Sequence, residues 1–376
     1  MLVVGGLERV ATSLSVGLQR RGEHVVVCSR GRARGVTVLR EELHEAGIQV
    51  VPIPRPKPTP RALIESAIRL AAVIRRESPD VVHAHNPAAA VAAALARLLA
   101  GRRSTAIVAT FHGLVEGETR RAVRPLVLAA DVVVGIGPSA SQELADAGFP
   151  RDRLLTVPNA VTAAVTRSRA DVRRELGIAD DAELLVTVGR YTIEKGQTLL
   201  IEAVARLAPR RPRLRALIVG LGPLENELRE SASRLGLGGI VQITGPRADA
   251  VDVIAAADVV VSTSIREGLG LTLLEALTVG TPVVASSVGG IPDVLDHGAA
   301  GLLFPSGDAE ALVAALERAL DDAELRERLL AEGRRHVAQN FGVDAMVDGY
   351  LSAYATAVSR RRSRSMRRRN GASSSK

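Results

Sequence analysis

Short runs of Val, Leu and Ile alternate along the chain with longer segments in which apolar residues recur every three or four positions. The first pattern is typical of buried parallel strands and the second of amphipathic helices. In the first part of the chain they predict strands at His24–Cys28, Val50–Ile53, Pro79–His83, Ala106–Thr110 and Asp131–Ile136, and helices at Gly6–Arg21, Val36–Gly47, Arg61–Glu77 and Ala88–Ala100. Such alternation favours a parallel sheet with right-handed crossovers.

A second alternating series begins near Glu183. Its predicted strands are Leu184–Val188, Arg215–Val219, Val241–Ile243, Val259–Ser262 and Pro282–Ala285, and its helices Gln197–Leu207, Leu224–Leu235 and Leu271–Val279. The 376 residues exceed the roughly 250–300 that one core usually reaches. We therefore predict an α/β protein of two doubly wound, Rossmann-like domains facing across a cleft, 1–163 and 164–341, with ligands at the carboxyl ends of the strands.

The beginning of the first domain departs from this pattern. A doubly wound domain usually opens with a strand before its first glycine turn, whereas only four residues, Met1–Val4, precede Gly5 and Gly6. We expect that upstream residues are missing from the sequence; the alternative is a very short first strand. Gly5 and Gly6 would open the first helix, whose N-terminus suits an anion.

The net charge of +8 belongs to the end of the chain. Residues 359–376 hold seven Arg, one Lys and no acidic residue, so the other 358 residues carry 41 basic and 41 acidic groups. We expect a disordered Arg-rich tail, because it has little to bury. It is either a solvated extension or a tether to anionic lipid. Nucleic acid is not expected as a partner, because no aromatic platform accompanies the charge.

The cysteine content and the lengths of the apolar stretches indicate where in the cell the protein is expected. The one cysteine, Cys28, cannot form an internal disulfide, and we interpret it as a small buried hydrophobe. No secretory h-region follows Met1, and the sequence contains no uninterrupted apolar stretch of about 18 residues. We expect a cytoplasmic protein, and the tail adds the hypothesis of a contact with the inner face of the membrane.

The segment SIREGLGLTLLEALTVGTPVV carries the strongest chemical signal. Glu267 and Glu275 lie eight residues apart, on either side of a turn opened by Gly268 and Gly270. The following helix, from Leu271 and Thr272 on, presents free N–H groups and partial positive charge to an anion such as diphosphate. Glu275 could accept hydrogen bonds from vicinal hydroxyls such as those of a ribose. A helix cap with a solvated glutamate is the alternative.

Two further loops follow predicted strands. In VGRYTIEKGQ, Arg190 follows a strand and Lys195 comes five residues later, where they could neutralise phosphate oxygens. The alternative is a solvated basic loop in which Glu194 neutralises Lys195. Gly220 opens a third strand-to-helix turn, which matches neither a phosphate-binding Walker loop nor a dinucleotide fingerprint.

Histidines end two strands of the first domain. His112 follows the strand Ala106–Thr110, and we expect it to face the cleft, although a lone histidine is more often structural than catalytic. His85 and Asn86 are interpreted as cleft lining and His83 as a packed residue. A metal site is not expected, because the sequence supplies no third ligand near the pair His83 and His85.

Together these residues resemble the retaining GT-B glycosyltransferases known as glycosyl transferases group 1, or family four. The likeness runs from Gly5 to about Tyr354. It rests on Gly5-Gly6-Leu7-Glu8, Gly189-Arg190 with Lys195, Gly220–Pro223, Glu267 with Glu275, and Val288-Gly289-Gly290-Ile291-Pro292. The resemblance implies that a last helix, 342–358, crosses back onto the first domain. It also implies transfer of a hexose-type sugar from a nucleotide-diphosphate sugar, UDP-sugar being favoured, to a saccharide or lipid-linked acceptor.

The resemblance also implies a role for each site residue. Glu267 would bind hydroxyls of the donor sugar and support its developing positive charge, while Glu275 would hold the ribose. Arg190 and Lys195 would neutralise the diphosphate, together with backbone N–H groups over Gly268–Thr272.

On the first domain, the resemblance implies that His112 faces the reacting sugar. Gly5 and Gly6 would approach the diphosphate and the acceptor. The reaction implied retains configuration and needs no metal and no cofactor other than the donor.

Two other functions stay open. One is a related GT-B enzyme, such as a nucleotide-sugar epimerase or a phosphorylase, although no lysine has the context of a pyridoxal site. The other is a catalytically impaired relative that acts as a nucleotide-sugar-binding or scaffold protein, which the short N-terminus favours and the intact Glu267 and Lys195 oppose.

Overall fold

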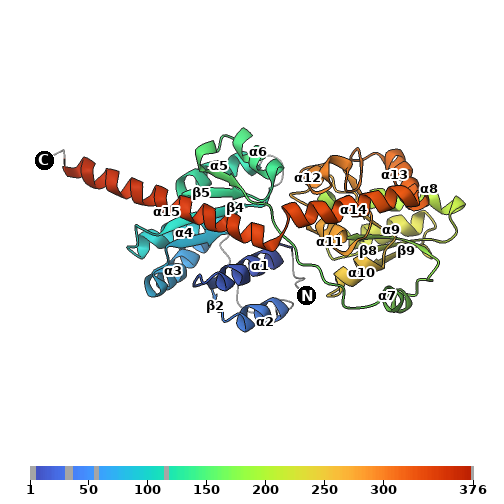
Figure 1. Cartoon of the computed structure of the whole chain (residues 1–376), viewed down its shortest axis with the longest axis horizontal. Helices are drawn as coiled ribbons and strands as arrows, with labels where there is room; N and C mark the ends of the chain where they lie inside the picture. Colours follow the sequence, from blue (N-terminus) through green and yellow to red (C-terminus); the bar gives the residue numbers. More distant parts are fainter. Residues whose placement is uncertain (1–5, 30–36, 55–58, 114–117, 374–376) are drawn as a thin grey trace. The chain divides into compact units, whose positions relative to one another are not determined.

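The computed structural model describes residues 6–29, 37–54, 59–113 and 118–373, which divide into two compact units. Unit 1 comprises Met1–Asn159 together with Val343–Lys376, and unit 2 comprises Ala160–Gly342 (Figure 1). The chain therefore returns to unit 1 after completing unit 2. The predicted opening strand, Met1–Val4, and Gly5 lie outside the described residues.

Unit 1 is an α/β unit whose described strands form two parallel sheets, β1-β2 and β3-β4-β5-β6. The strands are β1 Val26–Ser29, β2 Gln49–Pro52, β3 Val81–Ala84, β4 Ala106–Phe111, β5 Val132–Gly135 and β6 Leu154–Thr156. The helices are α1 Gly6–Arg20, α2 Thr37–Glu45, α3 Pro60–Glu77, α4 Pro87–Leu99, α5 Glu118–Ala129, α6 Pro138–Asp146 and α15 Val343–Ser373. Strands β4 and β5 are buried at every position, as their unbroken apolar runs predict.

Unit 2 is built on one six-stranded parallel sheet in the order β12-β11-β10-β7-β8-β9. The strands are β7 Glu183–Val188, β8 Leu214–Val219, β9 Val241–Thr244, β10 Val259–Ser262, β11 Val283–Ser286 and β12 Leu302–Phe304. The helices are α7 Arg169–Glu175, α8 Gln197–Leu207, α9 Glu225–Arg234, α10 Ala250–Ala256, α11 Leu271–Val279, α12 Ile291–Val294, α13 Ala309–Asp321 and α14 Ala323–Asn340. The strand order reverses between β7 and β10, the arrangement of a doubly wound sheet.

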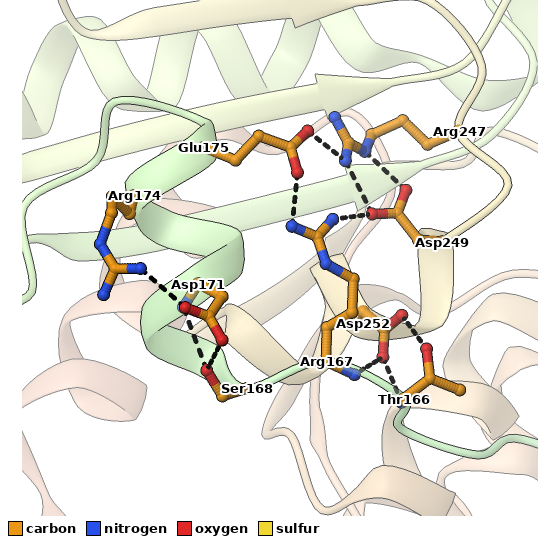
Figure 2. A network of polar contacts seen from close by, with 9 residues as sticks. All are labelled: Thr166, Arg167, Ser168, Asp171, Arg174, Glu175, Arg247, Asp249 and Asp252. Carbon is orange, nitrogen blue, oxygen red and sulfur yellow. Dashed lines mark hydrogen bonds and ion pairs between the residues drawn. The ribbon is translucent and has the colours of Figure 1, made fainter.

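The chain enters unit 2 through a polar network (Figure 2). Asp252 of α10 accepts hydrogen bonds from the backbone N–H groups of Thr166 (2.6 Å) and Arg167 (3.0 Å), and from the Thr166 hydroxyl (2.8 Å). The Arg167 guanidinium pairs with Asp249 (2.7 Å) and with Glu175 of α7 (2.5 Å). The segment before α7 is therefore fixed to unit 2 from Thr166 onward.

The end of the chain corrects one prediction. Residues 359–376 were expected to be disordered, whereas α15 continues without a break to Ser373 (Figure 1). Arginine has a high helix propensity, so a helix already anchored on a sheet can extend through an Arg-rich segment. Ion pairs hold the beginning of this Arg-rich segment to unit 1: Arg360 contacts Asp152 (2.6 Å), and Arg361 lies 3.6 Å from Asp131.

Candidate functional site

The predicted donor residues of unit 2 follow two neighbouring strands. β7 and β10 pair in parallel, with Val260 opposite Val186, and the strand order reverses between them. Adjacent loops diverge at such a point, which leaves a crevice outside the carboxyl ends of the strands. Lys195 lies in the connection after β7 and Glu267 in the connection after β10. The topology thus brings together two motifs that are 72 residues apart.

Lys195 and Glu267 form a direct ion pair between Nζ and Oε2. Their side chains are 25% and 16% exposed, so the pair is partly shielded from water yet reachable. The Ser264 hydroxyl also donates to Oε2 of Glu267, at 3.3 Å. Glu267 thus keeps its other carboxylate oxygen for a ligand, and Lys195 can turn its ammonium group toward an anion.

Backbone hydrogen bonds tie the two connections to each other. The N–H of Ile265 donates to the carbonyl oxygen of Glu194 at 2.8 Å, and the hydroxyl of Thr263 donates to that of Lys195 at 3.2 Å. These hydrogen bonds fix the backbone of Lys195 relative to that of Glu267. Little further conformational entropy is therefore lost when the two side chains are placed.

The N-terminus of α11 faces the same place. Gly270 precedes the helix with a φ of 92°, which glycine adopts without strain. Leu271 and Thr272 stand in the first turn, where N–H groups have no partner within the helix. The Thr272 hydroxyl donates to the carbonyl oxygen of Val188 at 3.4 Å, which fastens this turn to the end of β7.

Two glycine turns press against the site. A Cβ on Gly289, whose φ is 53°, would overlap the carbonyl oxygen of Glu267, and a Cβ on Gly290 would overlap that of Gly268. In the same way, a side chain on Gly220 would overlap the carbonyl oxygen of Gly189. These glycines are therefore required by the close approach of backbone to backbone.

A pocket at this point collects some of the predicted residues. Its walls include Lys195, Glu267, Leu271 and Thr272, and also the unpredicted Ser264. Arg190, Gly268, Glu275 and Gly220 are not among its lining residues. Ser264 comes two residues after β10, so a polar residue just past a strand end was the signal that could have identified it.

Two of the predicted donor residues outside the pocket lining differ in their exposure. Arg190 is exposed, and its carbonyl oxygen accepts a hydrogen bond from the Gln197 side chain at 2.7 Å. Glu275 is half-buried in the second turn of α11.

In unit 1 the structure groups three histidines at the ends of β3 and β4. The rings of His83 and His85 have centroids 4.3 Å apart, and those of His85 and His112 stack at 5.8 Å. Burial lowers the pKa of His85 to about 4, and burial followed by the charge of His85 lowers the pKa of His112 to about 3. All three are therefore neutral near pH 7, because the pKa of His83 is lowered as well, by burial first.

His83 is a packed residue, as predicted. Its Nε2 lies 2.7 Å from the Thr110 hydroxyl, and its Nδ1 lies 2.9 Å from the hydroxyl of Tyr354 on α15. The Nε2 atom of His112 and the Nδ1 atom of His85 are buried without a hydrogen-bond partner. Gly6 opens α1 in the same unit.

The histidine stack predicts a pH dependence of stability. The folded pKa values of about 4 and 3 lie below the unfolded value of about 6.5, so the unfolded state binds more protons below that pH. The free energy of unfolding should therefore fall as the pH drops below about 6.5, by at most about 1.4 kcal/mol per pH unit for each histidine. Urea unfolding followed over a pH series measures this slope.

Two variants test whether the buried histidines cause this pH dependence of the free energy of unfolding. His112→Gln should reduce the pH dependence by about one proton, whereas His44→Gln, at an exposed position of α2, should leave it unchanged. Equal slopes in the wild type and in His112→Gln would show that this ring does not stay neutral in the folded state.

Two negative observations concern the described ranges only. Within them no cluster of three or more His, Cys, Asp or Glu side chains is arranged to hold a metal ion. Nor does any described helix combine the length and the apolar character needed to cross a bilayer.

Comparison with known proteins assigns a family. Residues 168–336 match the model of glycosyl transferases group 1, and residues 4–165 match that of glycosyltransferase family 4. The chain is 30% identical over 395 residues to the D-inositol 3-phosphate glycosyltransferase of Saccharomonospora viridis, covering 93% of this chain and 90% of that protein. It is 26% identical over 362 residues to the N-acetyl-alpha-D-glucosaminyl L-malate synthase of Bacillus anthracis, covering 93% and 94%.

Solved structures agree on the fold. HepE from Anabaena, crystallised in complex with UDP-glucose, matches with a TM-score of 0.81 at 22% identity, over 94% of this chain and 96% of that one. WaaG, a glycosyltransferase involved in lipopolysaccharide biosynthesis, matches with a TM-score of 0.70 at 20% identity, over 94% and 96%. The chain therefore belongs to the glycosyl transferases group 1 and has the GT-B fold of two Rossmann-like domains.

Proposed function

We propose that this glycosyltransferase moves a hexose-type sugar from a nucleotide-diphosphate sugar, UDP-sugar being favoured, to a saccharide or lipid-linked acceptor, with retention of configuration and without a metal ion. One observation carries the proposal. The Lys195–Glu267 ion pair lies at the β7–β10 switch point, beside the N-terminus of α11. A cation, an anion and free N–H groups at one place suit a ligand that joins a polyol to a diphosphate.

Unit 2 would hold the donor. Lys195 and Arg190 would pair with the diphosphate oxygens, and the first-turn N–H groups of α11 would donate to them. This positive charge would stabilise the leaving diphosphate. In other transferases a divalent cation has this role. Glu275, one turn into α11, would accept hydrogen bonds from the two ribose hydroxyls.

Glu267 would change partners when the donor binds. In the ion pair it neutralises Lys195, and with the diphosphate present Lys195 gains a stronger anionic partner. The carboxylate of Glu267 would then accept hydrogen bonds from hydroxyls of the donor sugar. Its negative charge would stabilise the positive charge that develops on the sugar ring as the bond to phosphate breaks.

Unit 1 would supply the acceptor side. His112, kept neutral by burial, would donate a hydrogen bond to the reacting sugar without repelling its developing positive charge. Gly6, at the start of α1, would allow backbone to approach the diphosphate. The acceptor hydroxyl would attack from the face that the diphosphate leaves and pass its proton to the leaving phosphate oxygen, which yields retention.

Related proteins support the choice of donor. The Anabaena structure contains UDP-glucose, and the two relatives are named as an N-acetyl-alpha-D-glucosaminyl L-malate synthase and a D-inositol 3-phosphate glycosyltransferase. We include a peripheral contact of the Arg-rich segment with an anionic membrane surface in the proposal. The seven arginines of residues 359–376 support it.

Thermal unfolding with UDP, GDP and ADP in separate samples tests the donor site. A nucleotide at about a hundredfold its dissociation constant should add roughly 2.7 kcal/mol to the stability of unit 2. UDP is expected to give the largest increase in Tm. If none of the three shifts the Tm, unit 2 does not bind a nucleotide diphosphate, and the non-catalytic scaffold becomes the better interpretation.

A further inference from the structure

Five arginines gather on unit 1 at the edge where the strands of its β3–β6 sheet begin. They come from α4, from the turn before β6 and from one side of α15. We call them the arginine cluster: Arg97, Arg153, Arg360, Arg361 and Arg364. Two carboxylates, Asp131 and Asp152, contact them in the described part of the chain. The five arginines and these two carboxylates together carry a net charge of +3.

Asp131 cannot satisfy the arginines around it. This carboxylate is 2% exposed, and its Oδ2 accepts hydrogen bonds from the Ile107 N–H (2.9 Å) and from Arg97 (3.0 Å). Its Oδ1 lies 3.6 Å from Arg361 and 3.6 Å from Arg364. A separation of 3.6 Å is an ion pair but too long for a hydrogen bond. The Nη1 groups of Arg361 and Arg364 that face Asp131 therefore still need an acceptor.

Two other members of the cluster each have one N–H group without an acceptor. The Nε atoms of Arg97 and Arg360 are buried without a hydrogen-bond partner. Within the described residues, the hydrogen bonds of Arg153 go to carbonyl oxygens, such as that of Val127 at 2.9 Å. No carboxylate accepts a hydrogen bond from this guanidinium group there. Burial, and after it the nearby arginine charges, lower the pKa values of Arg97 and Arg153.

Arginines in two other places of the described chain are matched by acids. At the amino ends of β7 and β8, Arg211 pairs with both Glu183 and Asp321, and Arg210 pairs with Glu317. In the network of Figure 2, three arginines face four carboxylates. The cluster therefore differs from these two places in its surplus of guanidinium groups over carboxylates.

We propose that the arginine cluster binds a phosphate-type oxyanion in front of Arg361 and Arg364. These side chains are 18% and 49% exposed, so an anion can reach them from solvent. Guanidinium groups match the oxygens of phosphate in charge and in geometry. The phosphate is either free in solution or part of a lipid headgroup, and both sources present the same chemistry. The cluster lies on unit 1, whereas the predicted donor residues belong to unit 2 apart from Gly5 and Gly6.

Thermal unfolding in sodium phosphate and in sodium chloride of equal ionic strength tests the proposal. At about ten times the dissociation constant, phosphate should raise the Tm of unit 1 by about 3 to 5 °C. Arg364→Gln should lose most of this increase, because it removes an open donor group while breaking no hydrogen bond that holds the fold.

The matched control is Arg362→Gln, an exposed position on the same helix. Two residues correspond to about 200° of helix, so Arg362 points away from Arg364 and from the cluster. The control removes the same charge, and it also accounts for general stabilisation by phosphate and for phosphate bound near Lys195. An equal loss in both variants, or no difference between the two salts in the wild type, overturns the proposal.

Vesicles distinguish the two sources of phosphate. If the site takes lipid headgroups, the chain should sediment with vesicles of phosphatidylglycerol more than with those of phosphatidylcholine. Arg364→Gln should then weaken this binding more than Arg362→Gln does. If phosphate stabilises the chain in an Arg364-dependent way and the vesicles do not bind it, the site takes a free oxyanion.

Discussion

Glu267→Gln should lower the rate of glycosyl transfer by about two to three orders of magnitude while leaving the affinity for UDP nearly unchanged. The substitution keeps the size of the side chain and its ability to accept from Ser264, but it removes the negative charge. In our proposal that charge acts on the donor sugar only as the bond to phosphate breaks, so the loss appears in kcat. Initial rates with a UDP-sugar and UDP titration by calorimetry measure the two quantities.

Glu230→Gln provides the control for this experiment. Glu230 is an exposed glutamate of α9, and its neutralisation should change neither rate nor affinity. A variant that transfers at the wild-type rate would exclude Glu267 from the chemistry. Parallel losses of rate and UDP affinity would assign Glu267 a binding role only.

Gly289→Ala should destabilise unit 2 by about 3 kcal/mol or more and lower the rate of transfer by about a hundredfold. The new Cβ would overlap the carbonyl oxygen of Glu267, and the φ of 53° adds strain for any residue with a side chain. Relief requires the Glu267 backbone to move, and a shift of about 1 Å at a reacting group can cost about a hundredfold in rate. Thermal unfolding and initial rates check both parts.

Gly245→Ala separates this effect from the general cost of replacing glycine. A Cβ on Gly245 would have no heavy atom within 4 Å, and the substitution should therefore be nearly neutral or slightly stabilising. If Gly289→Ala behaves like Gly245→Ala, the two backbones do not approach each other as closely as described.

Strands and helices with long, regular apolar patterns could be predicted from the sequence. The prediction for β10, α8 and α11 agrees with the structure at both ends, and α3 differs by one residue. Some elements were missed: they include the long helices α13 and α14 and several elements with a short or broken pattern. β6 and β12 have three residues each, which is too few to establish a period, and α5 contains Pro125, which argues locally against a helix.

The candidate site could be predicted only as separate motifs. The turn around Gly268 and the lysine of Lys195-Gly196 both follow a strand, and that much is local information. Which loops become neighbours depends on the strand order, because β7 and β10 are adjacent while β8 and β9 lie between them in sequence. The need for glycine at 289 likewise depends on how closely the backbones pack.

By itself, the sequence determined the α/β class, the two alternating series and the motifs of a group 1 glycosyltransferase, because each depends on residues near one another in the chain. The tertiary structure alone decided which charges meet. It pairs Lys195 with Glu267, stacks His85 on His112, and turns the expected disordered tail into a helix whose arginines face the buried Asp131. Electrostatic energy depends on distance and burial in space, which neither composition nor spacing along the chain specifies.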